Sequence, residues 1–191
     1  MSAQCVGSLP EKKPRKRALS AGRRGLCLRR LIKPVAWLGK EKTMKKVLVS
    51  YFSRTGKTQQ MAEYIAEGLR ISGQDVDIKK ISDIKSEKEL AGYDGYIFGA
   101  PTYHRALPGS VETFLFLAQK GGLAGKAGGA FGSYTHSGDA PKMIFDTMEF
   151  VYKMNMVSLG PFNLLEHIVD TREGLKSCQD YGKAVGEMLG S

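Results

Sequence analysis

Residues 46–58 read KVLVSYFSRTGKT, an apolar run that passes directly into a loop of small, hydroxyl-bearing and basic residues. Val47 to Phe52 is apolar and β-branched with little alternation, which is typical of a strand buried on both faces of a parallel sheet. Gln59 to Ile71 follows with apolar residues at helical spacing and ends near Gly73, so it predicts a helix. The N-terminal part of the domain is therefore expected to be a strand, a loop and a helix.

The same alternation continues to the C-terminus. Further strands are predicted at Asp75–Ile81, Asp94–Ala100, Lys126–Ser133 and Met156–Leu159, and further helices at Pro108–Gln119, Asp139–Lys153 and Thr171–Leu189. Strands that alternate with helices form a parallel sheet covered on both faces, so the predicted fold class is an α/β three-layer sandwich with five parallel strands. Five large side chains recur on the predicted helices at core spacing, and we expect them to serve packing only: Phe114, Phe116, Phe145, Met148 and Phe150.

The net charge of +10 is concentrated in the first 43 residues. That segment carries twelve Lys or Arg against two Glu, and it lacks sustained hydrophobic periodicity, so it cannot bury enough apolar surface to offset its ordering entropy. Residues 44–191 are balanced in charge, and no apolar run approaches the roughly 18 residues that cross a bilayer. We therefore expect a basic extension without stable structure at 1–43 and one folded domain at 44–191.

The extension allows several interpretations. A basic arm for nucleic acid or acidic lipid, an Arg-rich transit segment and a partner-docking tail are all compatible with its composition. Because Met44 directly precedes the first strand, a start assigned too early or an expression-vector remnant also explains the segment, and this interpretation is favoured. The balanced charge of the remaining residues indicates that the folded part does not bind nucleic acid.

Cysteine usage indicates a reducing environment. Cys5, Cys27 and Cys178 lack the paired spacing of a disulfide framework or a zinc site, and the three histidines do not suggest a metal site. We therefore expect no metal, no membrane span and a cytoplasmic location.

The loop after the first strand consists of Ser53, Arg54, Thr55, Gly56, Lys57 and Thr58. The first turn of a helix leaves backbone N–H groups unpaired and carries partial positive charge, so it favours an anion. Gly56 allows close backbone approach, and the hydroxyl groups of the loop add donors. The loop predicts a site for a terminal monophosphate, while a capped turn without a ligand is the alternative for the same residues.

Gly56-Lys57-Thr58 is also similar to the end of the Walker motif of nucleotide triphosphatases. That motif requires a Gly five residues before Gly56, where this chain has Tyr51 inside the strand. A nucleotide-hydrolysing loop is therefore disfavoured.

Two further loops are expected at the same edge of the sheet, after the third and fourth strands. They contain Pro101, Thr102, Tyr103 and His104 in the first, and Ser133, Tyr134, Thr135, His136, Gly138 and Asp139 in the second. Ligands of open α/β sheets bind beyond the carboxyl ends of the strands. Each loop combines an aromatic residue with small polar ones, which suits a planar ring with polar edges.

Three motifs in order make the chain similar to short-chain flavodoxins and to the flavodoxin modules of larger flavoproteins. Ser53–Thr58 resembles Ser/Thr-x-Thr-Gly-x-Thr, Gly99–Tyr103 resembles Gly-x-Pro-Thr-Tyr, and Phe131–Tyr134 resembles the Phe-Gly-Ser-Tyr run. The resemblance covers nearly all of residues 46 to 190. It implies the strand order 2-1-3-4-5 and one non-covalently bound FMN.

By this resemblance, the loop Ser53–Thr58 holds the FMN phosphate. Pro101 to His104 would line one face and the N5 edge of the isoalloxazine, and Ser133 to His136, with Gly138 and Asp139 next to them, the other face. Typical flavodoxins carry carboxylates around the flavin, whereas the titratable groups here are Lys57, His104, Arg105, His136 and Asp139. We therefore expect a less negative environment for the flavin.

The resemblance implies a monomeric electron-transfer protein that shuttles electrons between redox partner proteins and needs no catalytic residue of its own. The alternative on the same fold is an FMN-dependent NAD(P)H:quinone-type oxidoreductase. Such enzymes usually need room for substrate beside the flavin, and the sequence contains no long insertion to supply it. A third class is a non-redox binding module whose basic arm targets nucleic acid.

Overall fold

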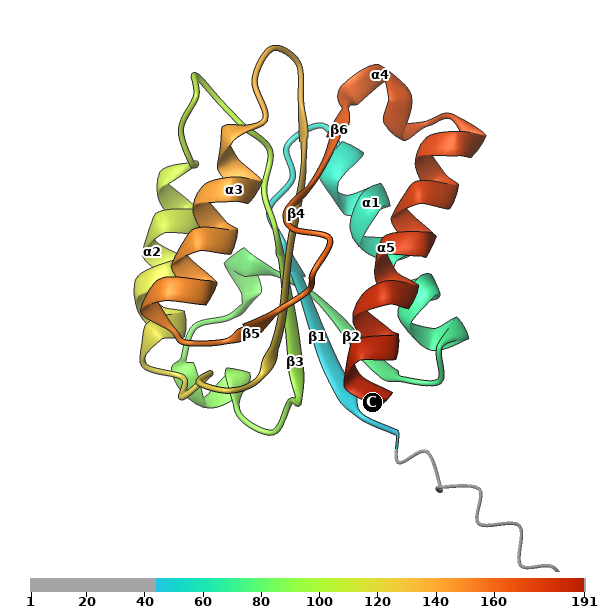
Figure 1. Ribbon diagram of the computed structural model, residues 1–191. Helices are drawn as coiled ribbons and strands as arrows, with labels where there is room; N and C mark the ends of the chain where they lie inside the picture. The colour runs from blue at the N-terminus through green and yellow to red at the C-terminus, as the bar shows by residue number, and fades with distance from the viewer. Residues whose placement is uncertain (1–43, 191) are drawn as a thin grey trace, which may run out of the picture. The chain divides into compact units, whose positions relative to one another are not determined.

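The computed structural model describes residues 44–190. The expectations for residues 1–43 and for Ser191 lie outside the described residues. Within the described part, strands and helices alternate along the chain and form a sheet between two layers of helices, as the sequence predicts (Figure 1).

Within residues 44–190, six strands pair in parallel in one sheet: β1 (Lys46–Tyr51), β2 (Asp75–Lys80), β3 (Gly95–Gly99), β4 (Ala127–Tyr134), β5 (Asn155–Met156) and β6 (Phe162–Leu165). Their order is β2-β1-β3-β4-β5, and β6 also pairs with β4. This confirms the flavodoxin-like order. Val47, Leu48 and Val49 of β1 are fully buried, because helices cover both faces of the strand.

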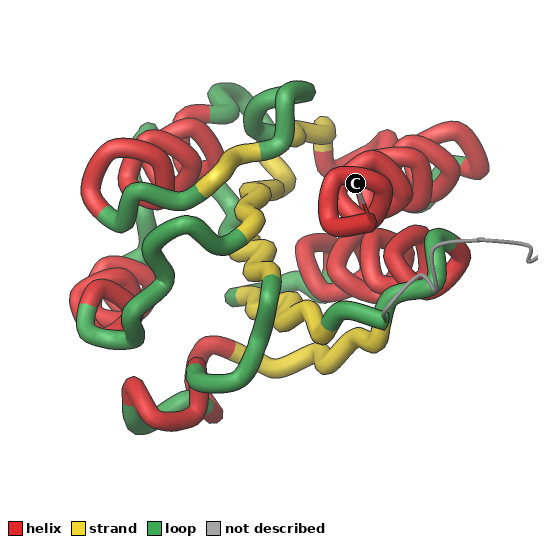
Figure 2. The backbone as a smooth tube through the Cα atoms, turned by 60° about the horizontal axis from the view of Figure 1, so that its bottom comes forward, coloured by secondary structure: helices red, strands yellow, loops and turns green. Residues whose placement is uncertain are grey.

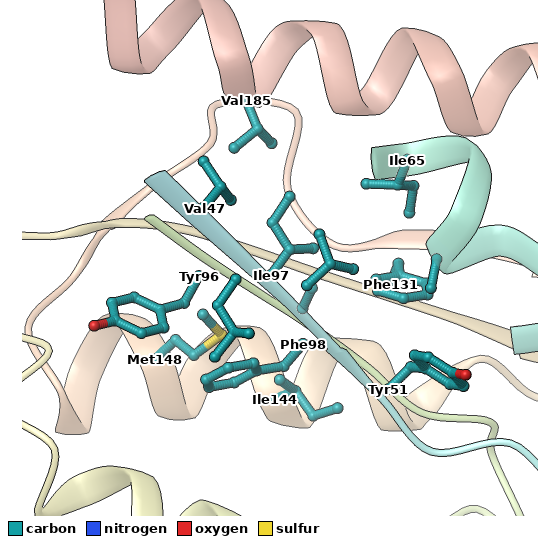
Figure 3. Close-up of a cluster of buried hydrophobic side chains, with 14 of the residues drawn as sticks. Val47, Tyr51, Ile65, Tyr96, Ile97, Phe98, Phe131, Ile144, Met148 and Val185 are labelled. Carbon is teal, nitrogen blue, oxygen red and sulfur yellow. The ribbon is translucent and has the colours of Figure 1, made fainter. Parts of the chain in front are cut away.

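Helices α1 (Lys57–Ile71) and α5 (Arg172–Gly190) cover one face of the sheet, and α2 (Gly109–Gln119) and α3 (Asp139–Asp146) cover the other (Figures 1 and 2). The remaining elements are short: η1 (Ile81–Asp83), η2 (Glu87–Leu90), the π-helical turn η3 (Thr147–Val151) and α4 (Glu166–Val169). Figure 3 shows the core on both faces, with Val185 of α5 above the sheet and Ile144 of α3 below it.

Glycines bring α1 and α5 into close contact. A Cβ atom added to Gly68 would lie 2.0 Å from the carbonyl oxygen of Gln179, and one added to Gly182 would lie 2.1 Å from that of Ile65. No larger residue fits either position without separating the helices. The second half of α1 therefore packs directly against the backbone of α5.

The expected fifth strand, Met156–Leu159, is wrong in its extent. The chain pairs with β4 only at Asn155–Met156, leaves the sheet, and returns as β6 at Phe162. Gly160 has a φ of 74°, which is unsuited to a strand, and Pro161 has no N–H for a strand hydrogen bond. The strand is therefore split by its own sequence.

The expected helix Asp139–Lys153 is also not uniform. It is α-helical to Asp146 and continues as the π-helical turn η3, in which the Tyr152 N–H donates to the Thr147 carbonyl oxygen at 3.1 Å. The Thr147 hydroxyl donates to the carbonyl oxygen of Met143 at 2.7 Å, a local bond that competes with regular helical geometry.

Two of the five side chains assigned to packing are not in the core. Phe114 and Met148 are buried as expected, and so is Phe145, but Phe116 is 72% exposed and Phe150 is 62% exposed. The expectation was wrong for Phe116 because α2 has consecutive apolar residues from Phe114 to Ala118, so periodicity alone does not identify its buried side. It was wrong for Phe150 because this residue lies in the π-helical turn η3, where the period of an α-helix no longer applies.

Candidate functional site

The loop between β1 and α1 is shaped to bind an anion. Gly56 has a φ of 88°, and its N–H donates to Ser53 Oγ at 3.0 Å, which closes the loop into a tight turn. No side chain caps α1, and its first turn contains no acidic residue. The N-terminal N–H groups of a 15-residue helix therefore remain available for a ligand at this edge of the sheet.

Two buried hydroxyl groups lie next to each other at the base of this loop. Thr58 Oγ1 and Ser133 Oγ lie 3.1 Å apart, and both residues are 1% exposed. The Thr102 N–H donates to the Ser133 carbonyl oxygen at 3.1 Å. Thr58 and Ser133 thus join the three predicted loops to one another, and they support the site from below.

The loop after β3 is held in an uncommon conformation. Tyr103 and Ala106 exchange two backbone hydrogen bonds, of 3.2 and 2.9 Å, across the two residues His104 and Arg105. Both of these have positive φ angles, 49° and 62°, as in the mirror-image turns that normally use Asn and Gly. Left-handed backbone in a residue with a side chain costs roughly 1–2 kcal/mol, so this turn is strained at the edge of the site.

A cleft of about 340 Å³ opens between the loops that follow β3 and β4. It is lined by Thr102, Tyr103, His104, Arg105, Thr135, His136 and Ser137. The Arg54 guanidinium lies over the Tyr103 ring at 5.7 Å from its centroid, so the anion-binding loop contacts the wall of the cleft. Burial raises the pKa of Tyr103, with the Arg54 charge opposing the shift and Glu166 adding to it, so the phenol is neutral at physiological pH.

The other predicted residues surround this cleft. Thr102 Oγ1 accepts a hydrogen bond from the Ala140 N–H at 3.1 Å, and Arg105 Nε lies 3.5 Å from Asp139 Oδ2, so both contacts tie the loop after β3 to the start of α3. Pro101 is buried. Tyr134 ends β4 opposite Leu165 and is not among the residues that line the cleft.

Two carboxylates at this edge were missed by the sequence interpretation. Asp170 forms an ion pair with Lys57 of the anion-binding loop, and Glu166 Oε2 lies 3.5 Å from Thr135 Oγ1. Both residues follow β6, whose four residues gave no strand signal. Without that strand, the segment after it could not be placed at the carboxyl edge of the sheet.

The fixed charges around the site are balanced within the described residues. Arg54, Lys57 and Arg105 supply three positive charges, and Asp139, Glu166 and Asp170 supply three negative ones. The charged groups expected around the flavin from the sequence therefore have to be extended by two carboxylates, those of Glu166 and Asp170.

Residues 44–190 contain neither a cluster of metal-ligating side chains nor an activated thiol. Among residues 44–190, no three His, Cys, Asp or Glu side chains gather as a metal site would require. Burial raises the pKa of the Cys178 thiol to about 12, so this group is protonated and unreactive. No helix in the same range is long and apolar enough to span a membrane.

Comparison with known proteins agrees with the geometry. The family profile described as a flavodoxin domain matches residues 48–143. The chain is 32% identical over 141 residues to an NAD(P)H dehydrogenase (quinone) of Acidovorax ebreus (strain TPSY), covering 61% of this chain and 70% of that protein. Its structure is similar to that of a flavodoxin from the domain Archaea, with a TM-score of 0.69, 29% identity, and coverage of 75% of this chain and 98% of that one.

A second solved structure is similar in fold. Oxidised flavodoxin 1 from Bacillus cereus has a TM-score of 0.66 with 24% identity, over 75% of this chain and 98% of that one. The match of the family profile, the strand order and the loops at the carboxyl edge of the sheet agree with one another. The chain belongs to the flavodoxin family.

Proposed function

We propose that this protein binds one FMN without a covalent bond and carries electrons between redox partner proteins. The observation that carries the proposal is the convergence of three loops at the carboxyl ends of β1, β3 and β4, where an uncapped helix terminus adjoins a cleft lined by Tyr103 and His136. The position corresponds to the reversal of strand order at which open α/β sheets bind ligands.

The residues of the first loop fit a phosphate monoester. Its dianion suits the free N–H groups at the start of α1, with the hydroxyl groups of Ser53 and Thr55 beside them and Arg54 and Lys57 as nearby cations. Thr58 is buried against Ser133, and we assign it to supporting the loop.

The residues of the cleft fit a planar ring system. Thr102, Tyr103 and His104 form one wall, next to the buried Pro101. Thr135 and His136 form the other wall, with Tyr134, Gly138 and Asp139 adjacent to them in the chain. Aromatic and imidazole faces stack on a flat ring, and the polar groups of the loops suit its edges. Bound FMN supplies the redox chemistry, and the protein orients the ring and leaves one edge open to a partner.

A fluorescence titration with FMN tests the cofactor proposal. Adding FMN to the full chain should quench FMN fluorescence with micromolar or tighter affinity. Replacing Tyr103 by Ala should weaken binding about tenfold, since ring stacking contributes on the order of 1 kcal/mol. Tyr64→Ala, on α1 and away from the cleft, is the matched control. Equal affinities for the two variants would remove the cleft from the cofactor site.

A second candidate function is an FMN-dependent NAD(P)H:quinone-type oxidoreductase. The observation that favours it is the 32% identity to a curated relative of that name. The two candidates differ in what reduces the flavin. NAD(P)H alone should rapidly bleach the flavin absorbance of an oxidoreductase, whereas the flavin of a carrier should be reduced only when a reductase protein is also present. Quinone-dependent NAD(P)H oxidation by the purified, FMN-loaded chain would establish the second candidate.

We further propose that residues 44–191 are the functional unit and that it works in the cytoplasm. The buried free thiol of Cys178 supports a reducing compartment. A chain that begins at Met44 should bind FMN with the affinity of the full chain. A large loss of affinity on removal of residues 1–43 would give the extension a direct role in the site.

A further inference from the structure

Large apolar side chains gather on the outer surface of α2, α3 and η3, on the face of the sheet opposite α1 and α5. Phe116 is 72% exposed, Met143 41%, Phe150 62% and Val151 53%. Exposed apolar residues are common singly, but four large ones together mark an interaction site. We refer to these four residues as the α2–α3 face.

A groove of about 430 Å³ runs through this face between α2 and α3. Its walls are mainly apolar and include Leu107, Leu115, Phe116, Met143, Val151 and Tyr152. The Tyr152 hydroxyl donates to the Leu115 carbonyl oxygen at 2.6 Å, which fixes the floor of the groove. The groove is therefore formed by the packing of α2 against α3, and the exposed Phe116 ring lies at its edge.

The charges on α2 are arranged symmetrically about Phe116. Glu112 lies four residues before it and Lys120 four residues after it, so all three share one side of the helix. Glu112 and Lys120 are exposed, and neither forms an ion pair with another described residue. Thr113 and Gln119 lie at equal sequence distances from Phe116 as a further polar pair.

We propose that a second copy of this chain covers the α2–α3 face in a two-fold symmetric dimer. With the symmetry axis at Phe116, the two α2 helices run antiparallel and the two Phe116 rings meet. Glu112 of each copy then comes within reach of Lys120 of its mate. Each contact in such an interface occurs twice, because the same patch serves both subunits.

The charge pattern favours a second copy over an unrelated partner. Opposite charges at equal distances on either side of a two-fold axis pair twice in an antiparallel dimer, and Glu112 and Lys120 have this arrangement. The rotation brings the two Phe116 rings together at the centre of the interface, where aromatic residues contribute most to binding. The expectation of a monomer was implied by the resemblance to flavodoxins.

The first test is the mass in solution. Sedimentation velocity of the full chain at micromolar concentrations should give twice the chain mass of 20.9 kDa. Phe116→Asp should give the mass of one chain, with an unchanged circular dichroism spectrum because the side chain is already exposed. Ile71→Asp, at the end of α1, changes an equally apolar side chain that is 59% exposed and should leave the dimer intact.

The second test examines the pairing itself. Glu112→Lys and Lys120→Glu should each weaken dimerisation about tenfold, because each places like charges together twice. The double variant Glu112→Lys with Lys120→Glu restores opposite charges and should recover most of the affinity. A wild-type chain of single mass at all concentrations overturns the proposal, and so does a double variant no better than the single ones. FMN titration of the same variants reports the cofactor site separately.

Discussion

The hydroxyl group of Tyr181 accepts a hydrogen bond from the Ala130 N–H at 3.2 Å and lies 3.2 Å from the carbonyl oxygen of the same residue. Ala130 lies in β4 between the segments that pair with β5 and with β6, so no neighbouring strand reaches its backbone on that side. The hydroxyl also lies 3.1 Å from the Gly160 carbonyl oxygen, and the Phe162 ring stacks on Tyr181 at 5.0 Å. The Tyr181 side chain of α5 thus takes the place of a neighbouring strand as the hydrogen-bond partner of the Ala130 backbone.

Removing this hydroxyl should destabilise the domain. Tyr181→Phe keeps the ring but leaves the buried Ala130 N–H without a partner, and we expect the free energy of unfolding to fall by about 1–3 kcal/mol. Urea denaturation measures the change. Tyr64→Phe, on a half-exposed ring, should change it little, and equal effects of the two variants would contradict the assigned role.

Stability should decrease at alkaline pH. Burial raises the pKa of Tyr152 and of Tyr181 above the usual value of 10.0, so both phenols stay protonated in the folded protein while those of the unfolded chain ionise. The unfolded state is therefore favoured as pH rises above 10. Each tyrosine contributes a loss of about 1.4 kcal/mol per pH unit there.

Urea midpoints between about pH 9 and pH 11 measure this dependence. Tyr152→Phe removes one of these groups, and above pH 10 the slope of the unfolding free energy with pH should become shallower by up to about 1.4 kcal/mol per pH unit. An unchanged slope would mean that Tyr152 ionises alike in both states.

The turn at His104 and Arg105 should become more stable when a glycine is introduced. Arg105→Gly relieves left-handed strain, and after the greater backbone entropy of glycine is subtracted we expect a gain of about 0.5–1 kcal/mol in unfolding free energy. Lys153 has a φ of 57° away from the cleft, so Lys153→Gly is the matched control and should stabilise equally.

FMN titration then distinguishes the two glycine variants. Arg105 lines the cleft, whereas Lys153 does not, so only Arg105→Gly should change FMN affinity. An affinity change of the same size in both variants would indicate a general effect of flexibility.

The ion pair between Asp170 and Lys57 should oppose phosphate binding. The Asp170 carboxylate is a negative charge beside the proposed phosphate position, and it occupies the lysine. Asp170→Asn should tighten FMN binding up to about fivefold, since an exposed pair contributes at most about 1 kcal/mol. Asp146→Asn, in the surface pair with Lys142, should have no effect, and weaker binding by Asp170→Asn would assign Asp170 to positioning Lys57.

The first strand, the first helix and the loop between them were predictable because their signals are local, whereas the strand order was implied by the resemblance to flavodoxins. Val47 to Tyr51 is uniformly apolar, and Gly56 stands between that run and a periodic helix, so sequence neighbours and spatial neighbours coincide. The split of the fifth strand was missed because Gly160 and Pro161, which interrupt it, lie beyond Met156–Leu159, and because β6 is defined by its pairing with the distant strand β4.

The loops of the candidate site could be predicted from the sequence, but two of its charged residues could not. Tyr103 and His136 lie on loops that follow β3, predicted from an apolar run, and β4, predicted from a glycine-rich one. Glu166 and Asp170 follow the four-residue β6, whose register is set by pairing with β4 alone. The exposure of Phe116 escaped notice for a related reason: a helix with apolar residues on every side does not show which of them face solvent.

The interruption between β5 and β6 also limits what can add to the sheet. An intact outer strand presents a continuous row of N–H and C=O groups on which another chain can assemble into a fibril. Here that margin consists of a two-residue piece and a four-residue piece with a turn between them. An incoming strand finds no long uninterrupted template, so the break protects the folded protein against self-propagating aggregation from this side.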